Sequence, residues 1–156
     1  MIIREFEDED TEGIVHLFTE TVRKINSQDY SKEQIEAWAP QNPELTKWKG
    51  KLAKTITFVA EDNKRIIGFA QLENNGHLDC FYVAHDFINK GVGSKLLLEI
   101  EERAKLLSIT RLFTEASITA KPFFLSKGFN IIKEQFVELC GVKFRNYVME
   151  KGSHFK

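Results

Sequence analysis

The sequence predicts a mixed α/β domain, because the spacing of its apolar residues changes twice along the chain. Up to about residue 40, apolar residues recur at every third or fourth position, which is typical of amphipathic helices. From Thr55 to Ala84 the spacing becomes two and short turns interrupt it, which predicts an antiparallel meander of strands. Helical spacing returns after Ser94. The expected order is β-α-α-β-β-β-α-β-α-β-β, with a central helix that crosses between strands.

Local signals place the individual elements. The acidic residues 8–10 can cap a first helix, and Ser31 with Gln34 has the spacing of a capping box that opens a second. Pro40 ends the second helix, and the less regular stretch that follows, which holds Trp48, receives no element. The expected strands cover residues 1–6, 55–61, 65–73, 77–84, 111–116, 129–139 and 142–150. The expected helices run from about residue 10 to 24, and over residues 31–39, 94–107 and 119–127.

Size and charge limit the classes of protein to which the chain can belong. Its 156 residues hold no internal repeat or linker, so we expect one domain over residues 1–151 and a C-terminal tail over 152–156. The 22 Lys and Arg nearly balance the 23 Asp and Glu, which disfavours a generic nucleic-acid binder. The chain holds no apolar run of about 18 residues, and its acidic beginning is unlike a secretory signal. Two cysteines are too few for a four-ligand zinc site or a disulfide framework, so we expect no metal. Together these features predict a cytoplasmic protein without a membrane partner.

The most informative segment is the loop at residues 89–94, between a strand and a helix. Gly91 and Gly93 allow the backbone to approach a ligand closely, and Lys90 adds a positive charge. A helix N-terminus leaves N–H groups unpaired and partly positive, so the loop suits a phosphate or pyrophosphate. The dinucleotide fingerprint would need glycine where Leu96 stands, and the P-loop pattern is absent. The alternative that the two glycines only shape a turn stays open.

This loop and three other segments resemble one family. The segment N-K-G-V-G-S resembles the [Q/R]-x-x-G-x-[G/A] signature of the GNAT superfamily of acyl-CoA-dependent N-acetyltransferases, with Ile88 at the position that is usually Gln or Arg. The run F-Y-V-A-H-D-F before it resembles the strand end of that family. The run T-A-K-P-F-F-L-S-K-G-F at residues 119–129 resembles the family's A-x-x-(F/L)-Y-x-x-x-G-F helix, and residues 30–40 are similar to small bacterial members. The resemblance therefore covers nearly the whole chain.

The resemblance implies a fold and a cofactor. In the GNAT-like fold a mixed, mostly antiparallel central sheet splays apart, and acetyl-CoA, the expected co-substrate, lies in the wedge. The resemblance implies that Phe81, Tyr82 and Val83 offer strand backbone to the pantetheine, and that the Val83 N–H binds the thioester oxygen. The residues expected to wrap the pyrophosphate are Asn89, Lys90, Gly91, Val92, Gly93 and Ser94. The far wall of the cofactor arm would be lined by Ser117, Phe123 and Phe124.

Two residues of the strand before the loop are candidates for the base that takes a proton from the acceptor amine. His77 and Asp79 are two positions apart, so both are expected to share one face of the strand with Phe81 and Val83. An unperturbed His77 titrates near neutral pH, whereas Asp79 would need a raised pKa, or would orient a water or bind a cationic acceptor. Which of them acts stays open, and so does a solvent-exposed, inactive His77.

The expected reaction is a direct attack by the acceptor on acetyl-CoA in a ternary complex, without a covalent enzyme intermediate. The acceptor would be a small-molecule amine or a protein amino group. Phe124 replaces a tyrosine whose hydroxyl, in many family members, protonates the departing thiolate. This departure leaves open a non-catalytic acyl-CoA sensor or partner-binding module. A homodimer through the C-terminal hairpin, and a place for Trp38 and Trp48 in an acceptor pocket, also stay open.

Overall fold

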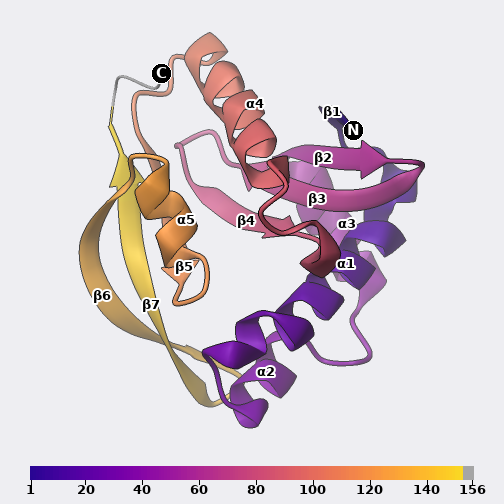
Figure 1. Cartoon of the computed structure of the whole chain (residues 1–156), viewed down its shortest axis with the longest axis vertical. Helices are drawn as coiled ribbons and strands as arrows, with labels where there is room; N and C mark the ends of the chain where they lie inside the picture. Colours follow the sequence, from indigo (N-terminus) through magenta and orange to yellow (C-terminus); the bar gives the residue numbers. More distant parts are fainter. Residues whose placement is uncertain (153–156) are drawn as a thin grey trace.

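The computed structural model describes residues 1–152 and arranges seven strands in two antiparallel sheets (Figure 1). The first sheet has the order β1-β2-β3-β4, with strands Ile2–Glu5, Ile56–Asp62, Arg65–Leu72 and Leu78–Val83. The second has the order β5-β7-β6, with strands Leu112–Ser117, Val142–Lys151 and Asn130–Leu139. The mixed α/β class predicted from the sequence is confirmed.

Five α-helices accompany the sheets within the described residues. Their bounds are α1 Thr11–Lys24, α2 Lys32–Trp38, α3 Leu45–Lys54, α4 Val92–Leu106 and α5 Lys121–Ser126. The capping box at the start of α2 is confirmed, because Ser31 accepts a hydrogen bond from the Gln34 N–H and Gln34 accepts one from the Ser31 N–H. Short 3-10 turns cover Asp8–Asp10, Asn26–Gln28 and His85–Phe87.

Helix α3 is an addition to the order predicted from the sequence. Its apolar residues Leu45, Trp48 and Leu52 are spaced by three and four, but lysines and a glycine separate them in a segment of only ten residues. Of these three, only Leu52 is fully buried. So short a segment with so few apolar residues gives a weak periodic signal, and packing against α1 and β2 makes the helix stable.

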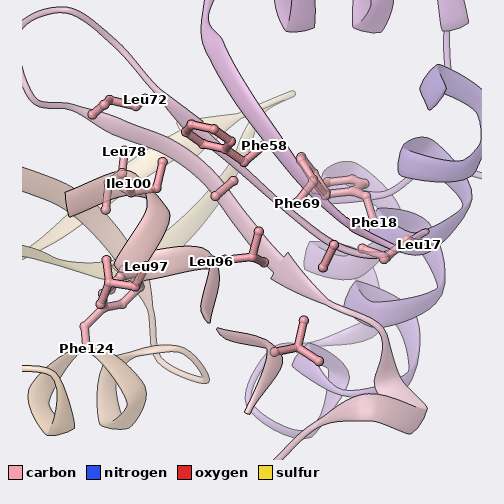
Figure 2. Close-up of a cluster of buried hydrophobic side chains, with 14 of the residues drawn as sticks. Leu17, Phe18, Phe58, Phe69, Leu72, Leu78, Leu96, Leu97, Ile100 and Phe124 are labelled. Carbon is pink, nitrogen blue, oxygen red and sulfur yellow. The ribbon is translucent and has the colours of Figure 1, made fainter. Parts of the chain in front are cut away.

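Helix α4 crosses between the two sheets and forms the centre of the core. Leu96, Leu97 and Ile100 are at most 2% exposed and pack with Leu72 and Leu78 of strands β3 and β4 (Figure 2). Complete burial of one such side chain stabilises the fold by about 1.5–3 kcal/mol. This packing fixes the N-terminus of α4 beside the end of β4.

Strands β4 and β5 run parallel and meet only where they begin. A single bridge joins His77 to Phe113, the Phe113 N–H donates to the Gly76 carbonyl at 3.0 Å, and Thr114 Oγ1 donates to the Leu78 carbonyl at 3.0 Å. A Cβ on Gly76 would lie 1.9 Å from the Arg111 carbonyl oxygen, so the close approach requires glycine. Beyond this junction the strands belong to different sheets, which confirms the predicted splay.

The described part of the chain ends just after β7. This strand ends at Lys151, where the sequence also predicts the end of the domain. Of the predicted tail 152–156, residues 153–156 lie outside the described residues. Among residues 1–152, the structure contains no helix with the length and apolar character needed to cross a membrane.

Candidate active site

A cavity of about 930 Å³ occupies the wedge between the diverging strands β4 and β5. Its walls come from these strands, from α1 to α3, from the starts of α4 and α5, and from the β6–β7 hairpin. The predicted site residues that line it are Asp79, Phe81, Tyr82, Val83, Asn89, Gly91, Gly93, Ser94, Ser117, Phe123 and Phe124. Three predicted residues, His77, Lys90 and Val92, do not line it. Val92 is 2% exposed in the core, and the Lys90 ammonium lies 5.2 Å from the centre of the Phe87 ring.

The N-terminus of α4 forms one end of this cavity. Gly91 caps the helix with φ of +85°, in the left-handed region that favours glycine, and a Cβ there would meet no atom within 4 Å. Gly93 and Ser94 of the first turn also line the cavity. First-turn N–H groups have no partner within a helix and carry partial positive charge. This end can therefore hold a phosphate group.

An aromatic wall lies next to the N-terminus of α4. A Cβ on Gly93 would lie 2.9 Å from Phe123 Cε1, so the absence of a side chain lets the ring pack against the helix. The Phe123 ring centre lies 5.3 Å from those of Phe81 and Phe124, and Phe124 is only 2% exposed. These rings form a continuous apolar surface along one side of the wedge.

The backbone of β4 has free groups on its wedge side. The Ala84 N–H donates to the Ile67 carbonyl of β3 at 2.8 Å. Because such bonds alternate along an antiparallel strand, the N–H and carbonyl of Val83 point away from β3 and into the wedge. The Val83 carbonyl accepts a hydrogen bond from Thr21 Oγ1 at 3.0 Å, which agrees with this direction. The Val83 N–H is thus available as a donor inside the cavity.

A bulge in β4 changes the direction of the side chains before Phe81. Ala70 of β3 pairs with Phe81, but Leu72 pairs with Leu78, so β4 contains one extra residue between these pairs. An extra residue breaks the alternation of faces that the sequence pattern assumes. Side chains on the two sides of this bulge therefore need not follow the period of two.

The predicted face of Asp79 is wrong for this reason. The Asp79 carboxylate faces α3, where it lies 3.4 Å from the Lys51 ammonium. The Phe81 ring instead faces α5 and contacts Phe123. Tyr82 likewise faces the N-terminal helices, because its ring centre lies 5.0 Å from that of Phe18 of α1. The bulge turns this carboxylate toward the helices and away from the aromatic wall.

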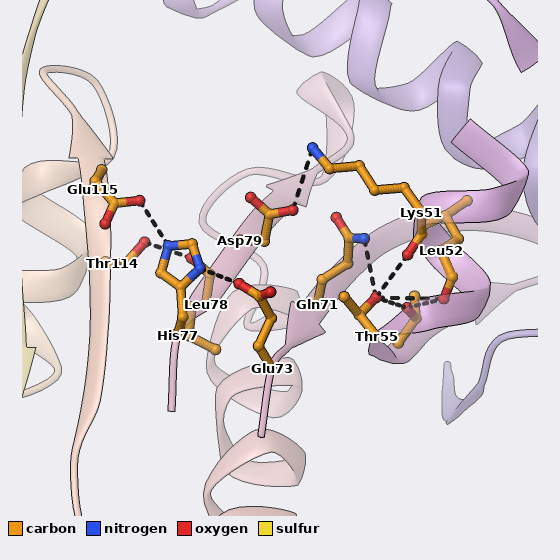
Figure 3. Close-up of polar contacts among 11 residues, drawn as sticks. Lys51, Leu52, Thr55, Gln71, Glu73, His77, Leu78, Asp79, Thr114 and Glu115 are labelled. Atoms are coloured by element: carbon orange, nitrogen blue, oxygen red, sulfur yellow. Dashed lines mark hydrogen bonds and ion pairs between the residues drawn. The ribbon is translucent and has the colours of Figure 1, made fainter. Parts of the chain in front are cut away.

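His77 lies between two carboxylates at the closed end of the wedge (Figure 3). Its Nε2 is 2.7 Å from Glu115 Oε1, and its Nδ1 bonds the Glu73 carboxylate. The hydrogen bond with Glu115, reinforced by Glu73 against the opposing effect of burial, raises the His77 pKa to about 9. At neutral pH the ring therefore holds its proton. Of the two candidate bases, Asp79 lines the cavity and His77 does not.

Aromatic side chains gather in the part of the cavity that α1, α2, α3 and β7 line. This aromatic end consists of Phe18, Tyr30, Trp38, Trp48 and Phe144. The ring centres of Trp38 and Phe144 are each 5–6 Å from that of Tyr30 and meet it tilted or edge-on. The Tyr30 hydroxyl donates to the Arg145 carbonyl at 2.7 Å and accepts from the Ile118 N–H at 2.9 Å. These bonds fix one wall of the aromatic end between α2 and the second sheet.

The family is shown by comparison with known proteins. Residues 26–151 match the model of the acetyltransferase (GNAT) domain, which covers most of the chain. The chain belongs to the GNAT family of acetyltransferases. It is therefore an acyltransferase.

Individual GNAT relatives agree with this result. The chain is 36% identical to the uncharacterized N-acetyltransferase YafP of Escherichia coli over 148 residues, 94% of this chain and 93% of that protein. A GCN5-related N-acetyltransferase from Rhodopseudomonas palustris superposes with a TM-score of 0.93 at 28% identity, over 97% of this chain and 94% of that one. The PaiA N-acetyltransferase of Thermoplasma acidophilum, solved with coenzyme A, has a TM-score of 0.80 at 22% identity, over 97% and 98% of the two chains.

Some residues of this GNAT site were not predicted from the sequence. Lys51 of α3 and Tyr30 line the cavity without having been assigned to it. Lys51 follows Trp48 by three positions, a helical spacing that would have placed both on one face had α3 been predicted. Tyr30 gave no local signal, because it meets Phe144 only across 114 positions of sequence.

Cys80 lines the cavity but is a poor nucleophile. Burial raises the pKa of its thiol to about 12, so almost none of it is thiolate at neutral pH. Among the described residues, no group of three or more His, Cys, Asp or Glu side chains has an arrangement that could hold a metal ion. Two carboxylates line the cavity, those of Asp79 and Glu115, and Glu115 is bonded to His77.

Proposed function

We propose that this GNAT protein transfers the acetyl group of acetyl-CoA to an amine by direct attack in a ternary complex. One observation carries the proposal: a single cavity joins the N-terminus of α4 to Asp79, and the free backbone edge of β4 lies between them. The coenzyme A bound by the PaiA relative supports the choice of cofactor.

The cofactor is bound mainly by backbone groups. N–H groups at residues 91–94 hold the pyrophosphate, with the electrostatic help of the α4 dipole. The pantetheine follows the wedge side of β4, against the ring of Phe81 and the aromatic wall. The Val83 N–H binds the thioester oxygen, where negative charge develops during attack, and one such donor contributes about 3–4 kcal/mol.

The acceptor amine binds beside the Asp79 carboxylate. The amine nitrogen forms a bond to the acetyl carbon, the carbon–sulfur bond breaks, and the sulfur leaves as the thiolate of coenzyme A. The proton of the amine passes to the Asp79 carboxylate, directly or through a water. His77 is unsuited to this step, because two carboxylates keep it protonated. It instead fixes the closed end of the wedge.

Two measurements test the proposal. Acetyl-CoA should raise the melting temperature of the protein, because it binds the native state, and incubation with a suitable amine should release free thiol. In Gly91→Glu, the new carboxylate occupies the phosphate position and should abolish the thermal shift. Gly141→Glu is the matched control, because Gly141 also has positive φ and open space, but lies in the hairpin turn and does not line the cavity.

Either of two results would contradict the proposal. If Gly91→Glu binds acetyl-CoA as well as Gly141→Glu does, the phosphate site is elsewhere. If the wild-type protein binds acetyl-CoA but no amine releases thiol, the chain is a sensor of acyl-CoA, as the phenylalanine at position 124 suggests.

A further inference from the structure

Two opposite charges stand at the entrance to the aromatic end of the cavity. Lys51 Nζ and Asp79 Oδ2 are 3.4 Å apart, and their side chains are 62% and 25% exposed. So exposed an ion pair contributes little to stability. A ligand that carries both charges can therefore replace each partner with one of its own groups and keep the charges of both residues paired.

An α-amino acid has its two charges at the matching separation. Its ammonium and carboxylate are bonded to the same carbon, so their nitrogen and oxygen atoms lie about 3 Å apart. The ammonium can pair with Asp79 while the carboxylate pairs with Lys51. The amine is then beside the carboxylate that takes its proton.

The surrounding walls suit a flat apolar side chain. Trp38, Trp48 and Phe144 present aromatic surface, and Val137 and Leu139 of β6 add an aliphatic face. Asn146 Oδ1 is buried in the same cavity and has no hydrogen-bond partner among the described residues. A buried carbonyl oxygen without a partner favours a ligand that donates an N–H or O–H to it.

A polycationic acceptor fits this end less well. It would need a second free carboxylate, and the other acidic residue of the cavity lining, Glu115, is bonded to the protonated His77 at 2.7 Å. Lys51 would also repel a second cationic group. The charges at the entrance are thus complementary to a zwitterion.

We infer that the acceptor is a zwitterionic α-amino acid with an aromatic side chain, acetylated on its α-nitrogen. This inference rests on the proposed function and specifies its substrate. The products are the N-acetyl amino acid and free coenzyme A, and the proton released from the nitrogen goes to Asp79 or water.

Matched pairs of acceptors test the role of the carboxylate. Thiol release from acetyl-CoA is measured with tryptophan against tryptamine, phenylalanine against phenethylamine, and with spermidine. We expect kcat/KM to be at least about tenfold higher for each amino acid than for its decarboxylated partner, because only the amino acid pairs with Lys51. The variant Lys51→Met should lower the ratio of kcat/KM for tryptophan to kcat/KM for tryptamine by about tenfold, because the loss of the paired carboxylate affects only the amino acid. Lys54→Met is the control, because Lys54 is exposed on α3 and does not line the cavity.

The outcomes separate this inference from the proposed function. If tryptamine or spermidine is the better acceptor, or if Lys51→Met behaves like Lys54→Met, the substrate class is wrong although the chain remains an acetyltransferase. If acetyl-CoA neither shifts the melting temperature nor loses its acetyl group to any of these acceptors, the proposed function fails as well. A competitive effect of indole-3-propionate that Lys51→Met abolishes would support the carboxylate site without relying on turnover.

Discussion

His77 Nε2 lies 2.7 Å from Glu115 Oε1 and joins the two sheets at the point where β4 and β5 meet. Glu73 bonds the other ring nitrogen, so one imidazolium ring lies between two carboxylates. The His77 side chain is 16% exposed, which shields these interactions from solvent. Because the two strands separate beyond this point, the cluster fixes the closed end of the wedge in which the cofactor is proposed to lie.

The first prediction concerns pH and stability. The folded state raises the His77 pKa from 6.5 to about 9, so the cluster stabilises the fold fully below pH 6.5 and loses this effect as the pH rises through about 9. We expect His77→Gln to lower the free energy of unfolding by about 1–3 kcal/mol near pH 6 and by much less above about pH 9.5. Urea unfolding of both proteins across this range measures the difference. A difference that does not depend on pH would show that the charge of His77 is irrelevant.

The acidic side of the same cluster gives the opposite dependence. The hydrogen bond from His77 lowers the Glu115 pKa below its ordinary 4.5. This contribution is therefore complete above about pH 4.5 and is lost as the pH falls further. Glu115→Gln should flatten the acidic limb of the stability profile, and an unchanged limb would contradict the assignment.

The second prediction concerns the contact between Gly93 and Phe123. In Gly93→Ala the new methyl group would lie 2.9 Å from Phe123 Cε1, so the ring must move. We expect a loss of about 1–2 kcal/mol in stability and an increase of about tenfold in the Kd of acetyl-CoA, both from the displaced wall. Calorimetric titration and thermal unfolding measure the two effects.

A second helical glycine is the control for that experiment. A Cβ on Gly50 of α3 would meet no atom within 4 Å. Gly50→Ala should therefore gain about 0.5–1 kcal/mol from helix propensity and leave acetyl-CoA binding unchanged. Equal behaviour of the two variants would mean that the Gly93 contact has no consequence.

The third prediction concerns the Tyr30 hydroxyl, which bridges the Arg145 carbonyl and the Ile118 N–H. Tyr30→Phe removes both bonds and leaves two backbone groups without their partner, at a cost of about 1–3 kcal/mol. The same variant should raise the KM for the acceptor more than that for acetyl-CoA, because Tyr30 belongs to the aromatic end. A larger effect on acetyl-CoA would place this residue in the cofactor site instead.

The fourth prediction concerns the departing thiolate. Phe124 lines the cavity and carries no hydroxyl, so Phe124→Tyr would supply a proton donor there. We expect kcat to rise at pH values below about 8.5, the ordinary thiol pKa, with a smaller gain at higher pH. Phe129→Tyr is the control, since Phe129 is equally buried but does not line the cavity, and should only destabilise the fold. If the pH–rate profile of Phe124→Tyr matches the wild type, another group protonates the thiolate.

Much of the fold could be predicted from the sequence because it depends on near neighbours. The period of two from Thr55 onward predicts β2, β3 and β4, and the capping box of Ser31 starts α2 where expected. The loop at residues 89–94 was predicted to meet a ligand, and Gly91 and Gly93 do line the cavity. Helix α3 was missed because its few apolar residues gain their stability from packing.

By itself, the sequence determined the order of strands and helices around the glycine loop, since turns, caps and periodicity act over a few residues. Only the tertiary structure decided which polar groups face the cavity. The bulge opposite Gln71 turns Asp79 toward Lys51, and a carboxylate 38 residues along the chain keeps His77 protonated. Strand register and long-range ion pairs depend on residues that meet only in the folded chain. They decide that Asp79 lines the cavity, whereas His77 lies outside the lining and stays protonated.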